Sequence, residues 1–193
     1  MPPKRQRIRP EIFALRPIVE GCPPGLSPAS FSERALARVR ARRRPVQSWY
    51  LDLTLLAGYL GSERRYHHTA PISSIFALAE GLRLVEEEGM EARAERHREA
   101  AAALLEGASA LGFEPLVEAA HRLPMLCALR LPERVAAAGE AGLRGRLLEK
   151  YGIEVGGGLG SLAGRIWRIG LMGENARLAN VERLLCALRR ELG

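Results

Sequence analysis

The stretch Gly156-Gly-Gly-Leu-Gly160, followed by Arg165-Ile-Trp-Arg168-Ile-Gly-Leu171, decides the fold. The second run is short and mostly apolar, which indicates a strand, and the glycines before it indicate a turn. Residues 153–155 predict a strand that breaks at these glycines, and residues 113–117 and 125–131 predict two more. Because such strands are short and closely spaced, we expect one short, mainly antiparallel sheet.

Helices are predicted around these strands from apolar side chains that recur at the helical spacing. The clearest covers residues 71–88 and is expected to bury one stripe formed by Ile72, Ile75, Phe76, Ala79, Leu82 and Val85. Further helices are predicted over residues 32–43, 49–59, 90–111, 140–151 and 177–192. Helices on one face of a short antiparallel sheet define an α+β fold.

Positive charge is concentrated near the start of the chain. The net charge is +7, and residues 1–44 hold eleven Lys and Arg against three acidic residues. A surface for nucleic acid would therefore have to lie in that part, where arginines line the helix predicted at 32–43. No apolar run reaches the 18 residues of a membrane span, and the first residues lack the apolar stretch of a secretory signal. We expect a cytoplasmic protein without a membrane partner.

The passage Tyr66-His-His-Thr69-Ala-Pro71 carries the first candidate site. Pro71 suits the first turn of a helix, and a helix N-terminus attracts anions such as phosphate. The hydroxyls of Tyr66 and Thr69 lie just before it, so they either contact such an anion or serve the backbone of a capped helix. No metal site is expected at His67 and His68, because neighbouring side chains diverge and no further ligand stands at metal-binding spacing.

Arg168 is the second candidate, because its guanidinium interrupts an apolar strand. A buried charge is costly without a partner, and arginine is suited to holding a carboxylate through two hydrogen bonds. The alternative is an arginine on an edge strand that reaches water. The glycines at 156–160 either cradle a phosphate or form a flexible turn near a site; they lack the lysine of a P-loop.

From about Gly21 onward, the chain resembles the C-terminal part of the class V pyridoxal-phosphate-dependent aminotransferases, in particular the alanine–glyoxylate and serine–pyruvate enzymes. The resemblance covers nearly nine-tenths of the chain. The passages that carry it are Pro23-Pro-Gly-Leu-Ser27, Ser48-Trp-Tyr-Leu-Asp52, Tyr66-His-His-Thr-Ala-Pro71, His97-Arg-Glu-Ala100, Arg122-Leu-Pro124, Gly157-Gly-Leu-Gly160 and Arg168-Ile-Gly-Leu171.

This resemblance implies part of a fold-type I aminotransferase that uses pyridoxal 5'-phosphate, a small amino acid and a 2-oxo acid. It implies that Tyr66 and Thr69 contact the cofactor phosphate in a neighbouring subunit's site, and that Arg168 holds the substrate carboxylate. A homodimer or a partner subunit is therefore expected, while the amino donor and acceptor stay open. Residues 1–20 are an unmatched basic segment, 21–88 correspond to the end of the large domain and the connecting helix, and 89–193 to the small domain.

The sequence departs from the family at the residue that binds the cofactor covalently. The family's lysine precedes the Pro-Pro-Gly passage by about five residues, where this chain has Ile18. Lys4 and Lys150, the only lysines, stand at no matching position, and the large domain has no counterpart in residues 1–20. We therefore hypothesise the C-terminal piece of a transaminase; the alternative is an inactive partner that docks to a full-length subunit. The arginine-rich helix belongs to the resemblance, so no nucleic-acid partner is expected.

Overall fold

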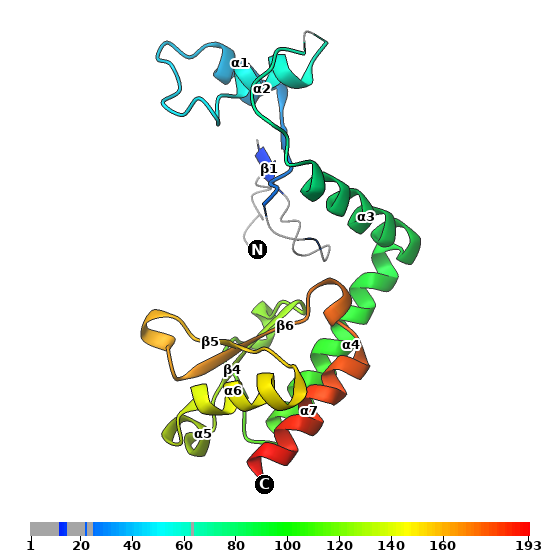
Figure 1. Ribbon diagram of the computed structural model, residues 1–193, viewed down its shortest axis with the longest axis vertical. Coiled ribbons are helices and arrows are strands. Elements are labelled where there is room, and N and C mark those ends of the chain that lie inside the picture. The colour runs from blue at the N-terminus through cyan, green and yellow to red at the C-terminus, as the bar shows by residue number, and fades with distance from the viewer. Residues whose placement is uncertain (1–11, 15–21, 23–24, 63) are drawn as a thin grey trace, which may run out of the picture. The chain divides into compact units, whose positions relative to one another are not determined.

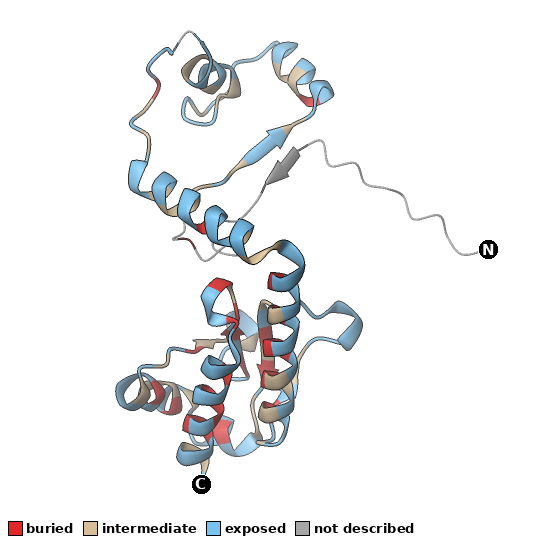
Figure 2. Cartoon of the chain, turned by 90° about the vertical axis from the view of Figure 1, so that its right-hand side faces the viewer, coloured by how far each residue is buried: buried red, intermediate tan, exposed pale blue. Residues whose placement is uncertain are grey.

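The computed structural model describes residues 12–14, 22, 25–62 and 64–193 and divides them into two compact units (Figure 1). The division falls after Leu78, inside the long helix α3 (Ile72–Glu88). Ala79–Gly193 form the second unit, to which Cys22 also belongs. Most of the buried residues lie in this second unit, as Figure 2 shows.

The first unit combines a small hairpin with two short helices. Strand β1 (Ile12–Ala14) pairs antiparallel with β2 (Ala29–Phe31). Helix α1 (Glu33–Arg40) begins after Ser32, whose hydroxyl accepts from the Ala35 amide, and α2 (Leu53–Leu60) begins after the capping carboxylate of Asp52. These caps fit the preference for short oxygen-bearing side chains at helix starts. The prediction that the second helix starts at residue 49 was wrong, because Asp52 fixes its start.

The second unit contains the predicted sheet. Its strands follow the order β3-β4-β6-β5, and all neighbours are antiparallel, which confirms the α+β architecture. The strands are short and lie among four helices and several single-turn 3₁₀ segments. In chain order these elements are α4 (Met90–Ser109), β3 (Glu114–Pro115), η2 (Ala119–His121), β4 (Leu126–Arg130), α5 (Glu133–Ala137), α6 (Glu140–Tyr151), β5 (Gly156–Gly157), η3 (Gly160–Leu162), β6 (Ile166–Gly170), η4 (Gly173–Asn175) and α7 (Leu178–Leu192).

One face of the sheet forms the core. Leu129 of β4 pairs with Trp167 of β6, and both are almost fully buried. Apolar residues of α4, α6 and α7 belong to the same buried cluster, among them Leu104, Leu147 and Leu188. Three helices therefore cover one face of the sheet, as predicted. Side chains alternate along a strand, so Arg168, next to Trp167, projects from the opposite face.

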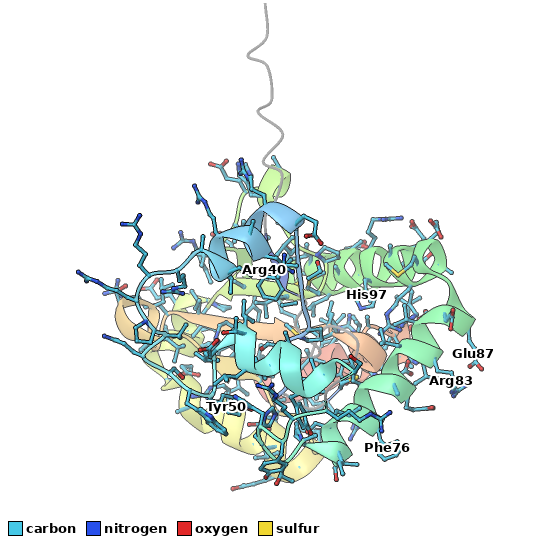
Figure 3. All side chains as sticks on the ribbon, turned by 90° about the horizontal axis from the view of Figure 1, so that it is seen from above. Arg40, Tyr50, Phe76, Arg83, Glu87 and His97 are labelled. Atoms are coloured by element: carbon cyan, nitrogen blue, oxygen red, sulfur yellow. The ribbon has the colours of Figure 1, made fainter. Side chains whose placement is uncertain are left out.

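The predicted buried stripe of the helix at 72–88 was wrong. Ile72, Ile75 and Phe76 are 59%, 46% and 70% exposed, and Leu82 is 47% exposed. Phe76 is labelled on α3 in Figure 3. The spacing gave the helix and its apolar face correctly, but within the described chain this face has too few neighbours to bury it.

Helix α4 buries apolar residues of its second half together with an arginine and a histidine of its first half. Its buried residues are Arg93, His97, Ala100, Ala101, Leu104 and Ala108, which recur at helical spacing. His97 is only 6% exposed (labelled in Figure 3), and its Nδ1 lies 2.7 Å from the Arg93 carbonyl oxygen. Polar residues normally indicate the solvent-exposed side of a helix, so the burial of Arg93 and His97 could not be predicted from the sequence pattern.

The start of α4 is tied to the segment before α7 by a charged cluster. Glu88 accepts hydrogen bonds from Arg93, at 2.8 Å, and from Arg96. Arg96 also donates to the carbonyls of Gly173 and Ala176, at 2.9 and 2.8 Å. The hydrogen bonds that Glu88 accepts from Arg96 and Arg93, with that of Arg96 contributing most, lower the pKa of its carboxyl group from the ordinary 4.5 to about 2.

Replacing Glu88 by glutamine should lower the free energy of unfolding of the second unit at pH 7. The difference in this free energy between the two proteins should shrink as the pH falls from 4.5 towards 2. The folded pKa lies below the unfolded one, so the ionised carboxylate stabilises the fold above about 4.5 and loses this effect as it gains a proton. Urea unfolding of both proteins at pH 7 and pH 3 measures it. Glu86→Gln, which removes an exposed carboxylate, is the control. If the two proteins differed in free energy of unfolding by the same amount at pH 7 and pH 3, the prediction would be contradicted.

Candidate functional site

The hydroxyls of Tyr66 and Thr69 meet just before α3. Tyr66 Oη and Thr69 Oγ1 lie 3.2 Å apart, and either oxygen can donate. Tyr66 is 78% exposed, so the pair faces solvent. Pro71 immediately precedes the first helical residue, Ile72, as the sequence predicted. Two hydroxyls beside a helix N-terminus are a suitable environment for a phosphate group.

Gly25, the last residue of the Pro-Pro-Gly passage, lies near the same helix start. Gly25 has a φ of 135°, which side-chain-bearing residues rarely adopt, and a Cβ built on it would lie 3.9 Å from Ser74 Oγ in the first turn of α3. The backbone at Gly25 thus lies against the first turn of α3. Two passages that are distant in the sequence therefore meet here within the first unit.

His67 and His68 stand between Tyr66 and Thr69 in the sequence, and their ring nitrogens are engaged with each other and with the backbone. Their Nδ1 atoms are 2.7 Å apart, and His67 Nε2 is 3.0 Å from the carbonyl oxygen of Trp49. His67 is 4% exposed and stacks on the Trp49 ring, with centroids 4.0 Å apart. Within the part of the chain that the structure describes, no group of three or more His, Cys, Asp or Glu could hold a metal ion.

Arg168 matches neither of its two predicted environments. It lies on β6, which is an interior strand, yet its side chain is exposed. Its Nε donates a 2.8 Å hydrogen bond to the Gly157 carbonyl oxygen on β5. Because the guanidinium is exposed, it does not need a bound anion to offset the cost of burying its charge. The bond at Nε instead fixes the base of the group and leaves its two terminal nitrogens to make the paired hydrogen bonds that a carboxylate accepts.

The glycine-rich stretch is explained by close backbone contacts. Gly156 and Gly157 form β5, opposite Arg168 and Trp167, so the strand predicted at 153–155 was wrong. A Cβ on Gly156 would lie 3.2 Å from the Arg168 carbonyl oxygen, and one on Gly157 would lie 3.3 Å from the Arg144 guanidinium. One on Gly158 would come within 2.0 Å of the Leu162 carbonyl oxygen. Close packing therefore explains why glycine stands at these three positions, and no phosphate site is needed to explain them.

Ile18, the position expected for the lysine, lies outside the described residues, as does Lys4. Lys150 lies on α6, with its Nζ 2.9 Å from Glu191 Oε1 of α7. It is thus engaged in an ion pair in the second unit. Among the described residues, no helix combines the length and the hydrophobicity that a membrane span requires.

Several known aminotransferases are similar to this chain in sequence and in fold. No family model matches the chain. Over 182 residues it is 42% identical to the alanine–glyoxylate aminotransferase of Callithrix jacchus, a match that covers 90% of this chain and 42% of the relative. The solved structure of an alanine–glyoxylate aminotransferase from Nostoc sp. is 46% identical with a TM-score of 0.83, covering 90% of this chain and 45% of that one. A ureidoglycine–glyoxylate aminotransferase from Bacillus subtilis is 38% identical with a TM-score of 0.84, covering 90% and 44%.

The chain is homologous to the C-terminal portion of alanine–glyoxylate aminotransferases and related class V aminotransferases. It spans less than half the length of the relatives described above. Its fold is that of the corresponding part of the fold-type I aminotransferases.

Two features of this chain were not predicted from the sequence. The first is the Gly157 carbonyl that anchors Arg168, because a backbone group leaves no sequence signal beyond the glycine itself. The second is the buried, stacked position of His67. Trp49 lies 18 positions from His67 in the sequence, so no local pattern indicates their contact.

Proposed function

We propose that this chain is the C-terminal part of a pyridoxal-phosphate-dependent transaminase of the alanine–glyoxylate or serine–pyruvate type. Such an enzyme transfers an amino group between a small amino acid and a 2-oxo acid. The observation that carries the proposal is the combined likeness to the Nostoc alanine–glyoxylate aminotransferase, at 46% identity and a TM-score of 0.83 over 90% of the chain. Residues 21–88 would correspond to the end of the large domain and the connecting helix, and 89–193 to the small domain.

The residues present fit the phosphate of the cofactor but not its covalent attachment. Tyr66 and Thr69 offer two hydroxyls 3.2 Å apart at the start of α3, which suits phosphate oxygens. When bound, pyridoxal phosphate supplies the carbonyl group and the electron sink that transamination needs. This chain has isoleucine where the family has the attaching lysine. Its contribution would therefore be to hold the phosphate, in a neighbouring subunit's site.

Arg168 would bind the carboxylate that amino-acid and 2-oxo-acid substrates share. The Gly157 carbonyl holds its Nε, so the terminal nitrogens are already oriented before a substrate arrives. Preorganisation of this kind reduces the entropy lost on binding. A carboxylate held there would keep the reacting end of a small substrate at a fixed distance from the guanidinium.

Association with a second subunit is supported by the apolar side chains exposed on the first unit. Leu60 is 80% exposed, and Ile72 and Phe76 are 59% and 70% exposed. Exposed apolar groups of this kind are typical of protein interfaces. The partner would be a second copy or, because this chain lacks the lysine, a full-length subunit to which it docks without catalysing the reaction. Co-expression with a full-length homologue distinguishes the two: stable co-purification favours the docking role, and a homodimer that ignores the homologue opposes it.

A chimera tests the transaminase proposal. Residues 21–193 of this chain would replace the matching C-terminal part of the Nostoc enzyme, which supplies the lysine and the large domain. We expect the purified chimera to convert alanine and glyoxylate into pyruvate and glycine, measured by coupled pyruvate reduction. A folded, soluble chimera without this activity would overturn the proposal.

In that chimera, Arg168→Lys should lower kcat/KM for alanine by roughly 10- to 100-fold, because an ammonium cannot make the paired bonds of a guanidinium. Steady-state kinetics with alanine varied measures the effect. Arg165→Lys is the matched control, since Arg165 is exposed just before the same strand. If both variants retained the activity of the unmodified chimera, Arg168 would not bind the substrate.

A further inference from the structure

His67 occupies an unusual place in the first unit. Within residues 25–62 and 64–78, only Ala35 and His67 are buried. The imidazole is 4% exposed and lies parallel to the Trp49 ring, with an interplanar angle of 8°. A buried polar ring is costly unless its nitrogens are hydrogen-bonded, so its partners identify what it does.

Both ring nitrogens of His67 have a partner, and together the partners fix the proton positions. A carbonyl oxygen can only accept, so His67 Nε2 carries the proton that bonds the Trp49 carbonyl, 3.0 Å away. In the neutral ring, Nδ1 is then an acceptor. His68 Nδ1, 2.7 Å from it, must carry the proton of that second bond.

The neighbours of His68 complete an aromatic cluster. Its ring lies edge-on to Tyr50, with centroids 5.0 Å apart, and is tilted against Tyr59 at 5.3 Å. The two histidines therefore connect three separate segments: the turn at Trp49 and Tyr50, the end of α2 at Tyr59, and the segment before α3. In His67 both ring nitrogens have a hydrogen-bond partner, and one face of the ring stacks on Trp49.

Tyr66 and Thr69 flank this anchored pair directly. Their own 3.2 Å contact is exposed, and among the residues that the structure describes no buried group is hydrogen-bonded to either side chain. The backbone between them is held at His67 instead. We propose that His67 is a positioning residue: through its bonds to Trp49 and His68 it presents the Tyr66 and Thr69 hydroxyls together to a phosphate group. The link to phosphate rests on the proposed function.

Two variants of the full chain separate the contributions of His67. His67→Phe keeps a ring that can stack on Trp49 but removes both hydrogen bonds. His67→Gln keeps an N–H close to the position of Nε2, and so retains the bond to the Trp49 carbonyl. His121→Phe is the control, because His121 is an exposed residue of the second unit. Resonances of the second unit report whether each variant is folded.

The first measurement is NMR of the chain without ligand. We expect nitrogen shifts that place the protons on His67 Nε2 and His68 Nδ1, and contacts between the Tyr66 ring and the Thr69 methyl group. His67→Phe should lose these contacts, whereas His67→Gln should retain them in part and His121→Phe in full. Retention of the contacts in His67→Phe, or a proton on His67 Nδ1 in place of Nε2, would overturn the positioning role.

The second measurement compares the binding of pyridoxamine 5'-phosphate with that of pyridoxamine by calorimetry. His67→Phe should weaken the binding of the phosphorylated compound about tenfold and leave that of pyridoxamine unchanged. If the phosphate contributes nothing in the unmodified chain while the NMR result holds, the phosphate role in the proposed function fails and the positioning role stands. Equal phosphate-dependent affinity in the unmodified chain and His67→Phe would overturn the inference.

Discussion

Mixed with alanine, glyoxylate and pyridoxal phosphate, the purified chain will form no more pyruvate than the same mixture without protein. In transaminases a lysine amine carries the cofactor and moves the proton between substrate atoms. The position expected for it is Ile18, and Lys150 is held in an ion pair with Glu191. No other lysine except Lys4 exists to replace it.

Coupled reduction of pyruvate measures this outcome directly. The Nostoc alanine–glyoxylate aminotransferase under the same conditions shows that the assay works, and the mixture without protein corrects for the slow reaction of the free cofactor. A rate that rises in proportion to the concentration of the chain, and survives further purification, would show that it catalyses transamination without the usual lysine.

Replacing Trp167 by alanine should destabilise the second unit by about 3–5 kcal/mol, the usual cost of emptying a large aromatic site in a core. Trp167 is fully buried on the central strand β6 and packs against Phe113, with ring centroids 5.4 Å apart. Its Nε1 also donates a 2.8 Å bond to Glu140 Oε2, which would lose a partner. Urea unfolding followed by circular dichroism measures the change.

Two further substitutions calibrate the Trp167 result. Trp167→Phe retains most of the ring volume and removes the bond to Glu140, so its effect should be intermediate. Leu148→Ala removes a large side chain from α6 that is 52% exposed, and should change stability far less. If Trp167→Ala cost no more than Leu148→Ala, Trp167 would not be the centre of the core.

The sequence was most informative where a pattern was long and had clear ends. The helix predicted at 140–151 occurs as Glu140–Tyr151, because Gly139 and Gly152, which flank it, both have positive φ angles. The strand with Trp167 and Arg168 was also predicted correctly. The hairpin of β1 and β2 was missed because its strands have three residues each, too few for a two-residue period to be recognised.

Predictions that depended on tertiary neighbours were less successful. The apolar face of α3 was recognised, but burial is decided by what packs against it, which periodicity does not contain. Tyr66 and Thr69 could be proposed as a pair because both lie just before a helix start. For Arg168 a buried and a solvent-exposed side chain were both open, and its bond to Gly157, 11 positions away, could not be predicted. The anchoring of His67 by Trp49 could not be predicted either, since the two residues are 18 positions apart.

The ion pair between Lys150 and Glu191 has a practical consequence for spectroscopy. Pyridoxal phosphate condenses readily with surface amines, and such adventitious adducts absorb light close to the bands of a specifically bound cofactor. With Lys4 and Lys150 as the only lysines, and the second of them engaged by a carboxylate, this chain should give a very low background of that kind. Weak, reversible association of vitamin B6 compounds could therefore be followed optically here with little correction for labelled side chains.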